Sequence, residues 1–237
     1  MNRDEQQVIG TFQTGVTSGW RVAEGVVVGA VGYTASMLFL LLSMFAVNSI
    51  PSLRYILGVY QLDTVIPAFF GVSGGILFAG PLAMWIVRRR RFGSLRQSIW
   101  WDCSNRVLGW AFLAGFASGT GYSLAKSALL GRGYQPNGPE YIVAFAVLAG
   151  IAEPAVEEVY FRGILFAALA GRFGRILGIA VVTTLFCLSH PKHYLAVLPV
   201  AVLLGGIRLY TGSVKACFAC HAAYNLSLVL FMLPINR

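Results

Sequence analysis

Long, almost uncharged apolar stretches alternate with short polar segments along the whole chain. A helix needs about 20 residues to cross the roughly 30 Å of hydrocarbon in a bilayer. The stretches that approach or reach this length are residues 25–47, 64–87, 107–130, 141–170, 176–190, 194–207 and 214–233. The pattern therefore predicts an all-α fold, a polytopic transmembrane bundle of about seven helices.

Two of these stretches, 176–190 and 194–207, are short for full crossings, and we expect a tilted or partly re-entrant pair. The first stretch is too long for the apolar part of a cleavable signal peptide, and the polar leader before it, residues 1–24, carries both acids and bases. This beginning is typical of a signal anchor. No repeat or long linker divides the chain, so residues 1–237 are predicted to form a single membrane domain.

Composition supports this prediction. Only 11% of the residues are charged and 57% are hydrophobic, whereas a soluble domain carries about 25% charged residues. The net charge of +9 raises the question of nucleic-acid binding, which requires a basic face on a soluble domain. The cations instead stand at the ends of apolar runs, so we expect a lipid bilayer and no nucleic acid as partner.

Lysine and arginine also predict the orientation, because cytoplasmic loops are enriched in them. With the N-terminus in the cytoplasm, that side collects Arg3, Arg21, residues 88–91, Arg96, Arg106, Arg172, Arg175, Arg208 and Lys215. The opposite side receives Arg54, Lys126, Arg132, Lys192 and Arg237. We expect a multi-pass protein of a cell membrane with a cytoplasmic N-terminus.

Glycines recur at four-residue spacing within the first three apolar stretches. Small residues at this interval let helix backbones approach closely in lipid. The pairs are Gly25 and Gly29, Gly71 and Gly75, and Gly115 and Gly119. We interpret them as helix-packing positions.

Four ionisable residues interrupt the fourth stretch, where each costs a few kcal/mol at mid-bilayer. Glu158 and Arg162 are four residues apart, so they share a helix face and are predicted to pair. Glu157 points about 100° away from Glu158, which leaves it free to act as a general base. Glu153 lies one turn before Glu157 on the same face. A purely structural buried ion pair is the alternative interpretation.

Two further apolar stretches each carry a pair of residues one turn apart, the first an aromatic packing anchor with an imidazole and the second two polar side chains. His190 follows Phe186 by four residues, and Asn225 follows His221 by the same interval. A lone membrane histidine is often only a hydrogen-bond partner between helices. Together, however, a carboxylate, two imidazoles and a carboxamide suffice for hydrolysis, since one group can activate water while others stabilise an oxyanion.

These three motifs resemble those of the CAAX prenyl protease and bacteriocin-processing family, also called the Abi family. They are Glu157-Glu158-x-x-x-Arg162, Phe186-x-x-x-His190 and His221-x-x-x-Asn225, in this order. The resemblance covers residues 141–233, the predicted catalytic core. It implies an all-helical intramembrane endopeptidase, and we expect a member from a bacterial inner membrane.

Carried over from the family, Glu157 would be the general base and would act with His190 on the attacking water. His221 and Asn225 would form the oxyanion hole, while Glu158 and Arg162 support the site. The family's eukaryotic member has eight spans where this chain has about seven, and no prenyl-binding groove is evident. The expected substrate is therefore a peptide or a membrane-protein segment.

The same residues permit other chemistry. Glu157, His190 and His221 could bind zinc, although the resemblance implies a mechanism without metal or cofactor. Cys217-Phe218-Ala219-Cys220-His221 matches a haem-attachment pattern, but haem would leave Glu157, His190 and Asn225 unexplained. Buried acids and histidines also serve proton relays, so a proton-coupled transporter is an alternative, as is a non-catalytic regulatory or bacteriocin-immunity scaffold.

Overall fold

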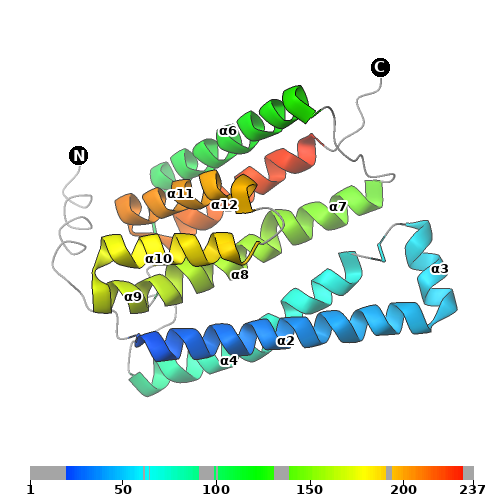
Figure 1. The fold of residues 1–237 in the computed structure, drawn as a ribbon, viewed down its shortest axis with the longest axis horizontal. Coiled ribbons are helices and arrows are strands. Elements are labelled where there is room, and N and C mark those ends of the chain that lie inside the picture. Colours follow the sequence, from blue (N-terminus) through cyan, green and yellow to red (C-terminus); the bar gives the residue numbers. More distant parts are fainter. Residues whose placement is uncertain are drawn as a thin grey trace.

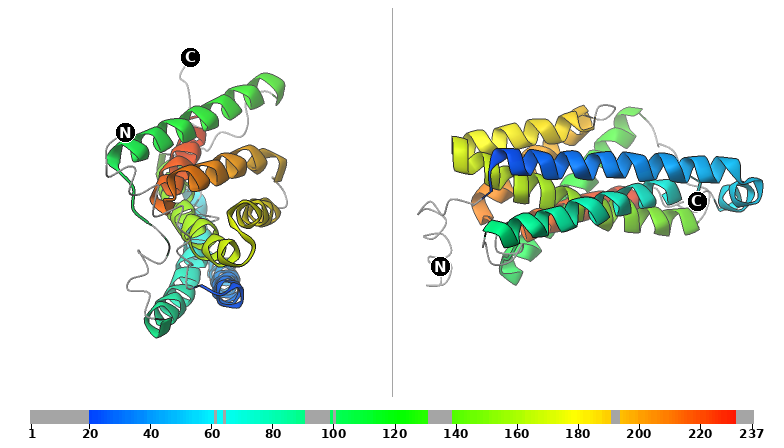
Figure 2. Two further views of the ribbon diagram at one scale, coloured as in Figure 1. Left: turned by 90° about the vertical axis from the view of Figure 1, so that its left-hand side faces the viewer. Right: turned by 90° about the horizontal axis from the view of Figure 1, so that it is seen from below.

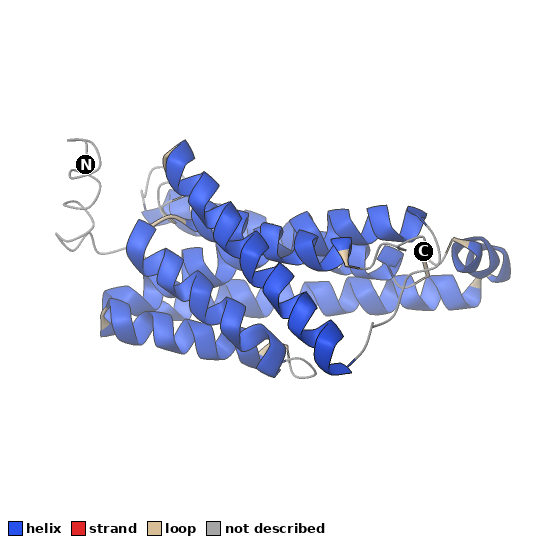
Figure 3. Ribbon diagram, turned by 90° about the horizontal axis from the view of Figure 1, so that it is seen from above, coloured by secondary structure: helices blue, strands red, loops and turns tan. Residues whose placement is uncertain are grey.

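The computed structural model describes residues 20–60, 62–63, 65–90, 99, 101–130, 139–190 and 194–231. Its elements are α2 (Val22–Ser49), α3 (Pro51–Val59), α4 (Val65–Arg90), α6 (Asn105–Leu130), α7 (Pro139–Val147), η1 (Leu148–Ala152), α8 (Glu153–Glu158), η2 (Val159–Leu165), α9 (Phe166–Phe173), α10 (Arg175–Leu188), α11 (Tyr194–Thr211) and α12 (Val214–Leu230). All of these elements are helical (Figure 3), which confirms the predicted all-α bundle.

The five elements from α7 to α9 follow one another without a break and form one long helix, Pro139–Phe173, with two π-helical segments inside it. Each predicted apolar stretch corresponds to one long helix of the structure. The short helix α3 was not predicted. It arises because Ile50 is extended and Pro51 at the first helical position has no N–H to continue α2.

The long helices run roughly along one common direction (Figure 1). α2 and α4 form an antiparallel pair on one side of the molecule, and α6 and α12 pack together on the other. The helix 139–173 lies between these pairs, with α10 beside α9 (Figure 2). This arrangement surrounds the middle of the helix 139–173 with neighbouring helices.

Two of the glycine pairs lie where helices come closest. A Cβ atom on Gly115 would collide with the main-chain carbonyl of Cys220, and one on Gly119 would collide with Ser227 and Tyr224, all on α12. On the other side of the molecule, a Cβ on Gly75 would collide with Ser36 of α2. The structure thus uses these glycines for helix packing.

The outer surface of the bundle is apolar. α2 and the part Val65–Arg89 of α4 are long and apolar enough to cross a membrane, and Arg175–Leu188, Val197–Thr211 and Val214–Leu230 are shorter apolar helices. Large side chains such as Leu41 and Phe45 are 63% and 71% exposed. Such extensive apolar exposure marks a surface that faces lipid. The molecule is a helical membrane protein.

The described cations gather at one end of the bundle. The start of α2, the end of α4, the start of α6, the α9–α10 turn and the α11–α12 turn all lie at this end (Figure 1). It carries Arg21, Arg88, Arg89, Arg106, Arg172, Arg175, Arg208 and Lys215. The opposite end carries Arg54 and Lys126; the remaining cations of the predicted division lie outside the described residues or side chains. We call these the arginine-rich end and the opposite end.

The pair α10–α11 is short relative to the bundle. α10 has 14 residues, or about 21 Å at 1.5 Å per residue, which is less than the hydrocarbon thickness. Figure 1 shows that the two helices meet partway along α2. α11 then returns to the arginine-rich end. The turn that carries His190 is therefore held inside the bundle's length.

Candidate active site

Two π-helical segments, η1 and η2, flank the single α-helical stretch α8 that carries the acidic residues. Pro154, at the start of α8, has no N–H and its ring displaces the carbonyl four residues earlier. That displacement accounts for the wider winding of η1. π-Helical turns occur frequently at functional sites because they re-aim side chains.

The predicted pair of Glu158 and Arg162 is present and completely buried. Arg162 Nη1 donates a hydrogen bond of 3.1 Å to Glu158 Oε1, and both side chains are 0% exposed. The guanidinium also stacks over the Phe186 ring, 4.1 Å from its centroid. The arginine thus compensates the buried carboxylate and ties α8 to α10.

His221 on α12 is oriented by Glu158. Its Nδ1–H donates to Glu158 Oε1 at 2.9 Å. The Glu158 carboxylate, which also accepts from Arg162, has no proton to donate to the histidine. The proton of this hydrogen bond is therefore on His221 Nδ1. The other ring nitrogen, Nε2, therefore faces Glu157 and lies 3.9 Å from its Oε2.

His190, after the end of α10, is oriented by the main chain. Its Nδ1–H donates to the carbonyl oxygen of Phe186 at 2.9 Å, and the two rings lie 4.9 Å apart. Its Nε2 lies 3.7 Å from Glu157 Oε1. Each carboxylate oxygen of Glu157 thus faces the Nε2 atom of a different imidazole.

The centre of this cluster is partly accessible. The side chains of Glu157 and His190 are 27% and 31% exposed, whereas His221 is 6% exposed. Glu153 also lies within electrostatic range of Glu157 and of both imidazoles. The arrangement combines a reachable carboxylate with fixed imidazoles, which is the geometry required to orient and activate a water molecule.

Asn225 approaches the site from α12 but makes a contact that its spacing did not predict. Its Nδ2 donates a hydrogen bond of 2.6 Å to the carbonyl oxygen of Ala149 in η1. Since a carboxamide has two N–H groups, one of them is committed to the main chain. Asn225 therefore anchors α12 to η1 through one of its two N–H groups.

Arg208 has a role that the sequence did not reveal. The charge pattern of the sequence predicts a cation of the cytoplasmic surface at this position, yet the Arg208 side chain is fully buried. Its Nε donates to the carbonyl of Arg162 at 2.8 Å, and its other nitrogens donate to the carbonyls of Gly212 and Ile99. Arg208 lies near the end of an apolar run in the sequence, as surface cations do. The sequence therefore could not show that its side chain points inward.

The haem pattern has no support in the geometry. Cys217 and Cys220 are both 0% exposed, and the Cys217 thiol donates to the carbonyl of Leu204. The His221 ring is held between Glu158 and Glu157. A thioether-linked macrocycle needs open space next to both sulfur atoms, and the packing of α12 leaves none.

No three His, Cys, Asp or Glu side chains in the described part of the chain are grouped so as to hold a metal ion. The donor types of Glu157, His190 and His221 would suit zinc, and both histidines have an outer partner of the kind that orients metal ligands. Metal binding by these residues stays a prediction that a chelator can test.

The fold and this cluster define a helical membrane protein with a carboxylate–imidazole centre in its interior. Residues 139–227 match the family model described as Rce1-like, type II CAAX prenyl endopeptidase. The match confirms the predicted resemblance to the CAAX protease family, a family of peptidases, over this part of the chain. The matched residues run from α7 into α12 and include every residue of the cluster. No match was found among curated proteins or among solved structures.

Proposed function

We propose that this protein is an intramembrane endopeptidase in which Glu157 is the general base. The observation that carries the proposal is the convergence of two Nε2 atoms on the two oxygens of one carboxylate, at 3.7 and 3.9 Å. These separations are too long for direct hydrogen bonds. They suit a water molecule shared between Glu157 and His190.

In the proposed reaction, Glu157 takes a proton from this water while the water oxygen attacks the carbonyl carbon of the peptide bond. The tetrahedral oxyanion is stabilised by the second N–H of Asn225 and by His221, which donates from Nε2 when both ring nitrogens are protonated. The C–N bond then breaks, and the proton passes from Glu157 to the leaving nitrogen. Removal of one oxyanion donor typically lowers the rate about 100- to 1000-fold.

The substrate that we propose is a peptide or a membrane-protein segment that reaches the site from within the bilayer. Support comes from the depth of the site, because Glu157 lies near the middle of the helix Pro139–Phe173. The family name implies prenylated carboxy-terminal peptides, so the same peptide with and without a farnesyl group should be compared.

The decisive experiment measures cleavage of a fluorogenic peptide by the full chain in liposomes. Glu157→Gln, His190→Ala and His221→Ala should each lower the rate by at least about 100-fold, as expected when general-base catalysis is lost. Glu140→Gln is the matched control, since this glutamate lies on the same long helix but is exposed, far from the site. Full activity of Glu157→Gln would show that the assigned base is wrong.

Two further measurements distinguish this mechanism and function from the alternatives. Loss of activity with a strong chelator, restored by zinc, would replace the metal-free mechanism with a metal-dependent one. A non-catalytic scaffold should tolerate Glu157→Ala in cells, and a proton-coupled transporter should show pH-driven uptake without cleavage.

A further inference from the structure

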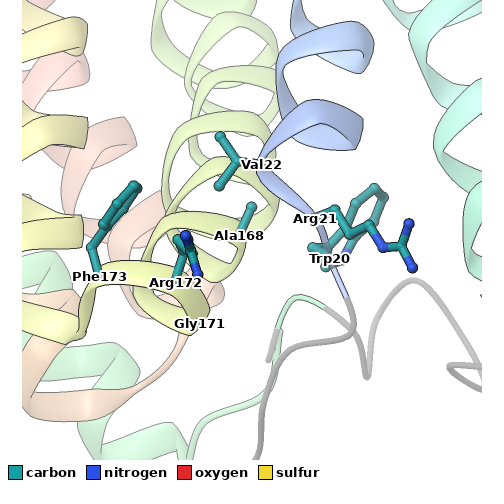
Figure 4. A pocket seen from close by; sticks show the side chains of 7 residues that line it. All are labelled: Trp20, Arg21, Val22, Ala168, Gly171, Arg172 and Phe173. Atoms are coloured by element: carbon teal, nitrogen blue, oxygen red, sulfur yellow. The ribbon is translucent and has the colours of Figure 1, made fainter.

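A separate cavity opens at the arginine-rich end of the molecule, away from the catalytic cluster (Figure 4). Its volume is about 430 Å³, which is within the range of small-molecule sites. The start of α2 and the end of α9 line it with Trp20, Arg21, Val22, Ala168, Gly171, Arg172 and Phe173. No residue of the proposed mechanism lines this cavity.

The floor and the rim of this cavity differ in chemistry. Trp20 and Ala168 are 3% and 2% exposed and form an apolar base. Arg21, the residue before α2, and Arg172 of α9 are exposed members of the lining (Figure 4). The cavity therefore offers two cationic groups above an apolar base.

Both guanidinium groups belong to exposed residues. The ion pairs recorded between described residues involve neither Arg21 nor Arg172. The acid nearest in sequence, Glu24, uses its Oε2 to accept the main-chain N–H of Arg21 at 2.9 Å. Two exposed arginines that line one cavity, and that pair with no acid among the described residues, offer a site for an anion.

The surroundings indicate which anion. Phe173 at the rim is 52% exposed, and Ile176 and Leu177, one turn further on, are 73% and 54% exposed. These apolar side chains continue from the rim along the start of α10. A ligand that fits both parts has a negatively charged head and apolar chains.

We propose that this cavity binds the headgroup of an anionic phospholipid, with Arg21 and Arg172 on its phosphate and its acyl chains along the exposed start of α10. Basic pockets between transmembrane helices recognise such headgroups. The lipid would tie the start of α2 to the end of α9 and so brace the helix that carries Glu157. This site is independent of the proposed peptidase reaction.

Binding can be measured with the purified full chain in detergent, by native mass spectrometry during titration with phosphatidylglycerol. The double variant Arg21→Gln/Arg172→Gln should bind roughly 30-fold more weakly, given the contribution of each cation near a membrane surface. The matched control, Arg54→Gln/Lys126→Gln, removes the same charge from the opposite end and should bind like the wild type. A third variant, Gly171→Leu, keeps both arginines but fills the cavity and should also weaken binding.

Each alternative result would overturn the proposal. Unchanged affinity of the Arg21/Arg172 variant would exclude the cavity as the site. Equal losses in both double variants would show that net charge, not this cavity, attracts the lipid. Equal affinity for phosphatidylcholine would remove the requirement for an anion, and inorganic phosphate binding as tightly as the lipid would identify the ligand as a free anion.

Discussion

The two histidines of the site are fixed by different partners with the same effect. His190 donates from Nδ1 to a main-chain carbonyl, and His221 donates from Nδ1 to Glu158. In both rings this contact selects the tautomer and directs Nε2 towards Glu157. Glu158 is therefore more than a neighbour of the proposed base, because it sets the orientation of one of its two imidazole partners.

At this scale the fully buried charge pair gives a sharp prediction. Arg162→Met removes the cation and leaves the Glu158 carboxylate in an apolar interior, which typically costs about 3–5 kcal/mol. The unfolding midpoint in a denaturing-detergent titration should fall accordingly. Cleavage should fall as well, because Arg162 no longer holds in place the Glu158 carboxylate that orients His221.

The double variant Glu158→Gln/Arg162→Met is the matched control for that experiment. Since neither charge remains, it should recover much of the stability lost in Arg162→Met. An additive loss in the double variant would contradict a direct interaction between the two side chains.

Sequence spacing predicts contacts within one helix far better than contacts between helices. The pairing of Glu158 with Arg162 and the ring contact of Phe186 with His190 follow from a four-residue interval. The bonds from His221 to Glu158 and from Asn225 to Ala149 join residues 63 and 76 positions apart. No periodicity encodes such distances, so the sequence indicated candidate residues but not how they are connected.

At the scale of elements, the interface of α6 with α12 depends on residues that have no side chain. A Cβ atom on Gly115 would overlap the main chain of Cys220, which is one residue before His221. Main chain cannot rotate out of the way as a side chain can. Close packing of these two helices thus helps to fix the depth and rotation of His221.

Gly115→Ala should therefore separate α6 from α12 and destabilise the protein by about 1–3 kcal/mol, a usual cost of overpacking. Gly121→Ala on the same helix is the control, since nothing lies within 4 Å of its added Cβ. The control should be neutral or slightly stabilising, because alanine favours helix by up to about 1 kcal/mol. Equal effects of both substitutions on the unfolding midpoint would contradict the close approach.

The elements also show what hydropathy cannot resolve. The apolar stretches of the sequence correctly predicted the position of every long helix, because a surface that faces lipid must be apolar along its whole length. The π-helical segments around α8 and the short helix α3 escaped prediction. They depend on local backbone geometry at Pro154 and Pro51, which leaves the apolar pattern unchanged.

For the molecule as a whole, the two ends differ in charge, and this asymmetry predicts its orientation. If the arginine-rich end faces the cytoplasm, a single cysteine at position 126 should react with a membrane-impermeant maleimide in intact cells. A single cysteine at position 172 should react only after the membrane is opened. Both variants need a background in which the native cysteines are replaced, and the reverse labelling pattern would invert the proposed topology.

The depth of the α10–α11 turn has a consequence for any substrate of the proposed reaction. His190 lies at this turn, partway along the bundle, where surrounding lipid offers no hydrogen bonds to the amide groups of an approaching segment. A helical substrate keeps its backbone hydrogen bonds there, which shields the bond to be cut. It must unwind locally before cleavage, and glycine or proline near the bond lowers the cost of that opening, since they favour the helix by about 1 and 3 kcal/mol less than alanine does.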